Sequence, residues 1–171
     1  MDVSDPEVAV RLNIGAGNKV IDGWLNVGLE DHHDIRADIR DLSVLEDDVA
    51  DEAMAIHVVE HILPWQVPGM LKEWLRVLKP GATLAIECPD IVKCAKNLIA
   101  GRADQEGMFG IYGDSRLADE LMLHRYGYTA QTVKNLLRDA GFIKVKETSP
   151  HFHGKRAHRD MRVECRKPEE Q

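Results

Sequence analysis

The sequence predicts an α/β fold with a doubly wound, mostly parallel sheet of seven strands. The strongest observation is a helix that leads directly into a strand within residues 67–88. Its apolar side chains recur with the spacing of an amphipathic helix, at Val67, Met70, Leu71, Trp74, Leu75 and Leu78. Pro80 and Gly81 are expected to end this helix, and the apolar run 83–88 then predicts a buried strand. Strand-like and helix-like segments alternate along the chain, which indicates a parallel sheet covered on both faces.

Apolar runs and turn residues predict the other elements. Six further strands are expected at residues 8–14, 24–29, 35–38, 53–59, 142–147 and 161–166. Two further helices are expected at residues 91–99 and 129–140, the second with Thr129 as its N-cap. The glycine-rich segment 101–113 predicts a loop. We therefore expect one domain over residues 1–171, with a lid or insertion at 91–128.

Composition limits the possible functions. The net charge of −7 argues against nucleic-acid binding as the main task. No apolar run approaches the roughly 20 residues of a membrane span, and the acidic, polar N-terminus does not resemble a signal peptide. The three cysteines, Cys88, Cys94 and Cys165, form no Cys-x-x-Cys motif and are expected to be free thiols. These features predict a cytoplasmic protein without a membrane or nucleic-acid partner.

A ligand site is expected at the carboxyl ends of the parallel strands, where open α/β sheets bind their ligands. The residues that follow the predicted strands there include 15–18, Glu30, Asp38 and 57–61. Gly15 and Gly17 would let the backbone come close to a ligand, because a side chain would occupy its space. The alternative for this Gly-x-Gly is a tight turn without a ligand.

Motifs along nearly the whole chain resemble, in order, those of class I S-adenosylmethionine-dependent methyltransferases, in particular a small type-11-like subgroup. The motifs are Asn13-Ile-Gly-Ala-Gly17, Gly23-Trp-Leu-Asn-Val27, Ala37-Asp-Ile-Arg-Asp-Leu42, His57-Val-Val-Glu-His61, Leu75-Arg-Val-Leu-Lys-Pro-Gly81, Pro89-Asp90, His124-Arg-Tyr-Gly-Tyr-Thr129 and Arg159-Asp-Met-Arg-Val-Glu164. This resemblance implies a Rossmann-like methyltransferase fold with an antiparallel last strand, and S-adenosylmethionine as the cofactor.

The resemblance also implies which residues bind the cofactor. Gly15, Ala16 and Gly17 would line it, Asp38 would accept the adenine amino group, and the Ile39 amide would meet a ring nitrogen. His57 would lie near the methionine part. Taken alone, Asp38 also fits a helix cap and His57 a core histidine. 

One position departs from the family pattern. The second strand ends Asn26-Val-Gly28, where the family has Asn-Val-Asp, so the usual ribose acceptor is missing. Glu30 lies two residues on, on the same face of the strand, and is the candidate replacement.

The implied reaction is methyl transfer to a small-molecule or glycan acceptor, at oxygen. His124 is the candidate catalytic base, because it precedes the last long helix and closes the predicted lid. The alternative for His124 is a structural histidine in the loop. Other candidates for the base are His61, Asp90, Tyr126, Tyr128, His151 and His153.

No metal is expected, because the pairs His32-His33 and His151-x-His153 lack the helical i, i+4 spacing of a hydrolytic zinc site, and Glu60-His61 adds little to them. Little helix precedes Val8, so one wall of the pocket is expected to come from a second subunit of a homodimer or from a lid formed by residues 101–128.

Three other functions remain as alternatives. A non-catalytic methyltransferase-like module that binds a ligand or a partner is favoured by Gly28. A nicotinamide-dependent oxidoreductase is disfavoured by Val20, which replaces the third glycine of the dinucleotide motif, and by the short connection between Gly17 and Trp24. A nucleic-acid methyltransferase is disfavoured by the acidic charge and by the lack of an Asn/Asp-Pro-Pro-Tyr/Phe motif after the fourth strand. The sequence has Cys88-Pro-Asp90 after the fifth strand instead.

Overall fold

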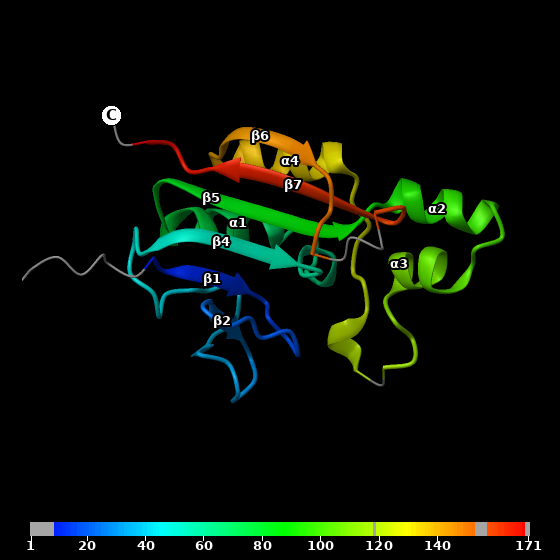
Figure 1. The fold of residues 1–171 in the computed structure, drawn as a ribbon, viewed down its shortest axis with the longest axis horizontal. Helices are drawn as coiled ribbons and strands as arrows, with labels where there is room; N and C mark the ends of the chain where they lie inside the picture. The colour runs from blue at the N-terminus through cyan, green and yellow to red at the C-terminus, as the bar shows by residue number, and fades with distance from the viewer. Residues whose placement is uncertain (1–8, 118, 153–156, 170–171) are drawn as a thin grey trace, which may run out of the picture.

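The computed structural model describes residues 9–117, 119–152 and 157–169. Its strands are β1 (Arg11–Ile14), β2 (Leu25–Gly28), β3 (Ile35–Arg36), β4 (Ala50–Ile56), β5 (Leu78–Pro89), β6 (Ile143–Thr148) and β7 (Asp160–Arg166). Its helices are α1 (Val67–Val77), α2 (Ile91–Ile99), α3 (Phe109–Tyr112) and α4 (Ala130–Ala140), with short helical segments η1 (Val59–His61), η2 (Asp104–Met108) and η3 (Glu120–Met122). Figure 1 shows these elements along the chain.

The strands of the described residues form one sheet in the order β3-β2-β1-β4-β5-β7-β6. β3, β2, β1, β4 and β5 pair in parallel, whereas β7 runs antiparallel to both β5 and β6. The chain thus winds outward in two directions from the β1–β4 pair. This confirms the predicted doubly wound, mostly parallel sheet with an antiparallel last strand.

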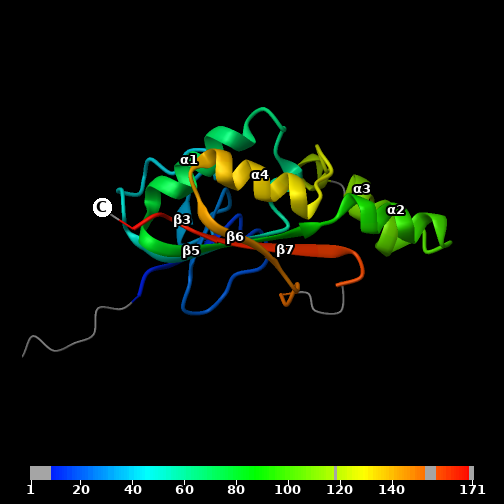
Figure 2. The same cartoon turned by 90° about the horizontal axis from the view of Figure 1, so that it is seen from above.

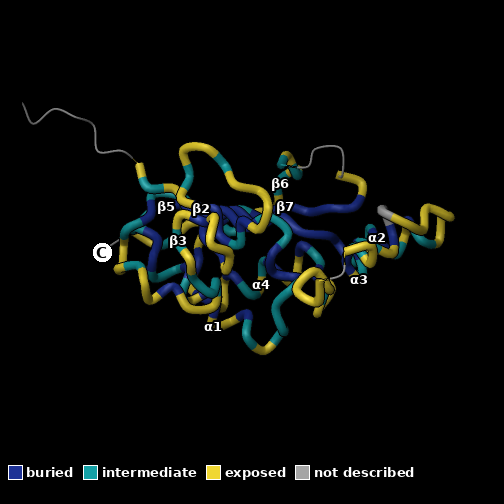
Figure 3. The backbone as a smooth tube through the Cα atoms, turned by 90° about the horizontal axis from the view of Figure 1, so that it is seen from below, coloured by how far each residue is buried: buried dark blue, intermediate teal, exposed yellow. Residues whose placement is uncertain are grey.

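Helices α1 and α4 pack against each other on one face of the sheet (Figure 2). Their buried side chains, such as Trp74 and Leu137, meet the apolar residues of the strands, such as Leu84. Figure 3 shows β7 as a largely buried strand. In the part of the chain that the structure describes, no helix covers the opposite face, so the expected cover on both faces is not found. The reason is that the β1–β2 and β2–β3 connections contain no helix.

The opposite face of the sheet carries hydrogen bonds and ion pairs where a helix would otherwise pack. Near β1 and β2, the Asn13 side-chain amide donates to the Lys19 carbonyl at 2.8 Å and to the Asn26 side-chain oxygen at 2.9 Å, which holds the connecting loop on the sheet. Further along the sheet, the face carries cross-strand charges, such as Arg162 with Glu87 at 3.2 Å. A parallel pair of strands usually needs a longer helical crossover; these polar contacts hold the short connection in place.

Two element boundaries differ from the prediction. α1 ends at Val77, and β5 begins at Leu78, so Pro80 and Gly81 lie within the strand instead of before it. The pairing explains this, because Ala50 pairs with Leu78 but Glu52 pairs with Thr83, which leaves a bulge between them. The first strand begins at Arg11, and Val8 lies outside the described residues.

The segment 101–113, predicted to be a loop, contains η2 and α3. Its glycines serve close packing. A Cβ atom at Gly107 would lie 2.5 Å from Leu98 Cδ2, and one at Gly110 would overlap Cys94 Sγ. Both partners belong to α2, so the glycines let this segment pack tightly against that helix. Among the described helices, none has the length and apolar character that a membrane crossing requires.

Candidate functional site

A cavity of about 980 Å³ opens at the carboxyl ends of β1, β2 and β4. The segment around α3 and η3 forms its other wall, with Phe109, Leu121 and Met122 in the lining. All the residues that the sequence assigned to cofactor binding or catalysis line this one cavity: Gly15, Ala16, Gly17, Glu30, Asp38, Ile39, His57 and His124. The structure therefore brings together residues from five separate segments of the chain.

The turn after β1 depends on Gly15, which has a φ of +74°. A Cβ atom there would lie 2.7 Å from Val58 Cγ2, so a side chain would meet both backbone strain and a steric clash. The Gly15 and Ala16 amides donate to the Val27 carbonyl at 2.9 and 3.0 Å. These bonds fix the turn over the end of β2. At Gly17, a Cβ atom would meet nothing within 4 Å, which leaves open space beside the backbone.

His33 occupies the space beside Gly28, where the family pattern has aspartate. A Cβ atom at Gly28 would lie 2.5 Å from His33 Cε1. The imidazole Nε2–H donates to the Gly17 carbonyl at 2.8 Å, and Nδ1 accepts from the Glu30 amide at 3.2 Å. His33 thus ties the turn after β1 to the turn after β2. This role of His33 was not predicted from the sequence. The usable signal was a histidine five residues after a glycine that stands where the family has aspartate.

Glu30 lies at the edge of the cavity with its side chain more than half exposed. Its Oε2 atom is 3.4 Å from His32 Nδ1, and His32 Nε2 is 3.2 Å from the Gly17 carbonyl oxygen. His32 and His33 therefore both contact the Gly17 carbonyl. Glu30 is held beside the same turn that carries Gly15 and Ala16.

Asp38 and Ile39 follow β3 and face the cavity. Both Asp38 carboxylate oxygens accept hydrogen bonds from the Arg40 guanidinium, which lowers the pKa of Asp38. No helix of the described residues begins at Asp38, so it is not a helix cap. The Ile39 carbonyl accepts a hydrogen bond of 2.8 Å from Trp74 Nε1, which anchors this turn to α1.

His57 bridges two buried carboxylates at the end of β4. It has a φ of +56°, a strained conformation for a residue with a side chain. Its Nδ1 lies 3.1 Å from Glu60 Oε1 and its Nε2 lies 3.1 Å from Asp160 Oδ2. The carboxylate of Asp160 also accepts a hydrogen bond of 2.6 Å from Arg159 Nε. His57 is therefore a charged link between β4, η1 and β7, which neither sequence alternative described.

Burial and pairing oppose each other in the pKa values of this network. Burial alone would lower the pKa of His57, but the hydrogen bonds to Asp160 and Glu60 outweigh it and raise the pKa to about 9. Burial alone would raise the pKa of both carboxyl groups. The bond from His57 instead holds the pKa of Glu60 below its ordinary value, and His57 and Arg159 do the same for Asp160. At neutral pH the network thus contains charged acids and a charged histidine.

His124 lies on the lid side of the cavity. Its Nδ1–H donates to the Gly110 carbonyl at 3.1 Å, and burial lowers the pKa of its imidazole. His61 is the other candidate base in the cavity lining, and the two rings stack edge to face with centroids 4.8 Å apart. 

The remaining candidate bases do not line the cavity. Asp90 caps α2 by accepting from the Val92 amide at 2.8 Å. Tyr128 is buried in the core, and Tyr126 and His151 are exposed. His153 lies outside the described residues.

Comparison with known proteins agrees with this architecture. Residues 13–86 match a family model described as a methyltransferase domain. No curated protein matches the sequence. A methyltransferase of Methanosarcina mazei, described as S-adenosylmethionine-dependent, has a similar structure with a TM-score of 0.64 and 18% identity, over 94% of this chain and 92% of that one.

Two further structures show the same fold. A S-adenosylmethionine-dependent methyltransferase of Archaeoglobus fulgidus has a TM-score of 0.62 and 16% identity, over 93% of this chain and 86% of that one. The 1,6-didemethyltoxoflavin-N1-methyltransferase of Burkholderia thailandensis, solved with 1,6-didemethyltoxoflavin and S-adenosylhomocysteine bound, has a TM-score of 0.60 and 18% identity, over 94% of this chain and 72% of that one. At these identities the likeness shows the fold.

The fold is thus that of the Rossmann-like methyltransferases, and the family-model match identifies a methyltransferase domain within it. Residues 13–86 thus match a methyltransferase domain, and the solved structures that share the fold are described as S-adenosylmethionine-dependent methyltransferases. This confirms the class that the order of the motifs indicated.

The link between β4 and β7 is expected to stabilise the fold. The variant His57→Gln removes the positive charge between two buried carboxylates, so we expect the free energy of unfolding to fall by about 3 to 5 kcal/mol. Urea unfolding followed by circular dichroism measures this change. The matched control His151→Gln changes an exposed histidine and should alter stability by less than about 0.5 kcal/mol. Equal stability of His57→Gln and the wild type would contradict the assigned role.

Proposed function

We propose that this enzyme transfers the methyl group of S-adenosylmethionine to a hydroxyl oxygen of a small-molecule or glycan acceptor. The observation that carries the proposal is that the predicted cofactor residues and His124 all line one cavity. The volume of about 980 Å³ is large enough for a nucleoside and a second small molecule. A cofactor and an acceptor would then meet between the strand ends and the segment around α3.

The cofactor end offers groups that suit an adenosyl ligand. Open space beside the Gly17 backbone allows close approach. The Glu30 carboxylate can accept hydrogen bonds from the ribose hydroxyls, in place of the missing aspartate at Gly28. Asp38 is paired with Arg40, but a carboxylate has enough lone pairs to accept from the adenine amino group as well. The Ile39 amide is proposed to meet an adenine ring nitrogen, as the resemblance implies.

His57 is proposed to act near the methionine part of the cofactor. It lines the cavity, yet both of its ring nitrogens are engaged by Glu60 and Asp160. Its contribution is therefore to hold the strand end and the buried carboxylates in position and to present a positive charge to a carboxylate ligand.

His124 is proposed to be the catalytic residue. When bound, S-adenosylmethionine supplies a sulfonium methyl group, whose carbon bonds to the acceptor oxygen while the carbon–sulfur electron pair stays on sulfur. Since Nδ1–H donates to the Gly110 carbonyl, Nε2 keeps its lone pair. That nitrogen can take the proton that the acceptor hydroxyl loses. Positioning and exclusion of water supply the remaining rate enhancement.

Residues 91–128 are proposed to form the lid of a single domain that spans residues 1–171. Their side chains Phe109, Leu117, Leu121 and Met122 line the cavity and give it an apolar wall. An apolar wall keeps water from the reacting groups. Arg116 and Arg125 add charged groups that suit a polar or anionic acceptor.

The acceptor and the location are each proposed on a separate observation. The bound small molecule of the Burkholderia thailandensis enzyme supports a small acceptor, and that enzyme's name makes nitrogen the competing methylation site. Three buried, unpaired cysteines support a cytoplasmic location. That the acceptor is not a nucleic acid stays a prediction, and so does the homodimer. The second candidate, a non-catalytic binding module, is favoured by the loss of the ribose acceptor at Gly28.

Cofactor affinity tests the role of Glu30. The variant Glu30→Gln removes a charge-assisted hydrogen bond worth roughly 1.5 to 3 kcal/mol, so the Kd for S-adenosylmethionine should rise about 10- to 150-fold. Isothermal titration calorimetry measures it, and the exposed control Glu46→Gln should bind like the wild type. Unchanged binding by Glu30→Gln would remove Glu30 from the site, and no binding by the wild type at millimolar ligand would favour the non-catalytic module.

Turnover tests the role of His124. With His124→Ala, kcat should fall at least about 100-fold because the acceptor loses its base, whereas the Kd for S-adenosylmethionine should stay within about twofold. Release of S-adenosylhomocysteine is followed with the best acceptor from a panel of sugars and hydroxyl- or amine-bearing small molecules. The control His151→Ala should keep the wild-type rate. An unchanged kcat for His124→Ala excludes it from catalysis.

A further inference from the structure

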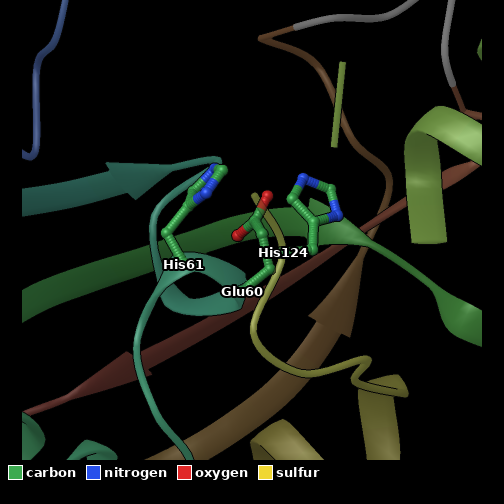
Figure 4. Close-up of side chains that lie close together, drawn as sticks. All are labelled: Glu60, His61 and His124. Carbon is green, nitrogen blue, oxygen red and sulfur yellow. The ribbon is translucent and has the colours of Figure 1, made fainter. Parts of the chain in front are cut away.

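Glu60, His61 and His124 form a group that the reaction described above does not fully use. In the described part of the chain, these residues offer three ligand atoms that all lie within 4.8 Å of one another. Figure 4 shows the Glu60 carboxylate between the two imidazole rings. His61 and His124 also line the cavity, so the group borders the acceptor side of the proposed site.

The backbone holds the two segments together. The Glu60 carbonyl accepts hydrogen bonds from the Arg125 amide at 2.7 Å and the Tyr126 amide at 3.3 Å. The His124 amide donates to the Tyr112 carbonyl at 3.1 Å. His124 is therefore placed beside η1 by main-chain bonds, whatever its side chain binds.

Both histidines are set in the same tautomer by backbone carbonyls. His61 Nδ1 lies 3.2 Å from the Leu123 carbonyl oxygen, and His124 Nδ1 lies 3.1 Å from the Gly110 carbonyl oxygen. A carbonyl only accepts, so each Nδ1 carries the hydrogen and each Nε2 keeps a lone pair. A histidine that ligates a metal through one nitrogen commonly donates its other N–H to such a group.

Glu60 contributes an unsatisfied oxygen. Its side chain is almost fully buried, and Oε1 accepts from His57 at 3.1 Å. Oε2 is buried and has no hydrogen-bond partner among the described residues. Leaving a buried carboxylate oxygen unpaired is costly. Because the neighbouring Nε2 atoms are also acceptors in these tautomers, a cation is the natural partner for all three.

We propose that Glu60, His61 and His124 bind one divalent transition-metal ion of the zinc type. Two imidazole nitrogens and one carboxylate oxygen are a donor set of catalytic zinc sites, which keep a further position open. Magnesium and calcium prefer oxygen ligands only. Ligand atoms around tetrahedral zinc lie roughly 3.3 Å apart, so these side chains would close by up to about 1.5 Å. His61 and His124 are only partly buried, which permits this movement.

Sequence spacing did not reveal this site. His57 and His61 lie four residues apart and would share a face of a helix. In the structure, His57 ends β4 with a φ of +56° and turns to Asp160, so the second histidine comes instead from the distant lid segment. The proposal revises the expectation that no metal binds.

The role of the ion rests on the proposed function, but the binding of the ion does not. An open coordination position facing the cavity would take the acceptor hydroxyl oxygen, lower its pKa and hold it toward the methyl donor. With the ion bound, His124 would act as its ligand, which replaces the role of base proposed above for the metal-free chain, and the ion-bound acceptor hydroxyl would give its proton to water.

Cobalt(II) is the probe for this site, because it occupies zinc sites and absorbs visible light. The chelator-treated full chain is titrated with Co²⁺ and followed by visible absorption and calorimetry. We expect one Co²⁺ per chain, and we expect His61→Ala and Glu60→Gln each to weaken binding by more than about 100-fold, beyond the 10- to 100-fold cost of changing an outer partner. His151→Ala removes an exposed histidine as the matched control and should bind Co²⁺ like the wild type. Circular dichroism and S-adenosylmethionine binding show that each variant is folded.

Absence of Co²⁺ binding by the wild type would overturn the site, as would binding that His61→Ala and Glu60→Gln leave unchanged. Methyl transfer by a chain that binds no Co²⁺ would overturn the ion site and leave the proposed function standing. Co²⁺ binding that both variants lose, together with no transfer to any acceptor, would support the site and contradict the proposed function.

Discussion

The cavity depends on the buried link from Asp160 through His57 to Glu60. These charges are out of water, where an unpaired carboxylate would cost several kcal/mol. The link joins the end of β4 to the start of β7 and holds His57 in a strained backbone conformation. The residues on either side of Glu60 therefore have fixed positions, with Val58 against Gly15 and His61 beside His124. Both ends of the cavity rest on this one network.

The cofactor end is built with few elements. The short β1–β2 connection contains no helix, and polar side chains hold it in place. Asn13 binds the Lys19 carbonyl and Asn26, while His32 and His33 contact the Gly17 carbonyl. Gly28 and His33 belong together, because the ring takes the room that a side chain at Gly28 would need. Glycine at position 28 thus leaves the room that the His33 ring occupies, and Glu30 stands beside it at the cavity edge.

Sequence reasoning predicted the architecture and the neighbourhood of the site. Alternating apolar runs and ordered motifs were enough to predict a doubly wound, mostly parallel sheet with an antiparallel last strand, and each predicted cofactor residue follows a strand whose end meets the cavity. The errors have local causes. The glycines at 107 and 110 serve packing against α2, so the predicted loop is helical. The hydrogen bond of His57 with Asp160 and the proximity of Glu60 to His124 both join distant segments, which no spacing rule along the chain detects.

The most direct test is a crystal structure of the chain with S-adenosylhomocysteine. The account predicts the adenosine beside the turn after β1, with both ribose hydroxyls on the Glu30 carboxylate and the adenine at Asp38 and Ile39. A complex with the Glu30 side chain turned to solvent and the ribose held by other groups would contradict it. So would a cavity that stays free of ligand at saturating concentration.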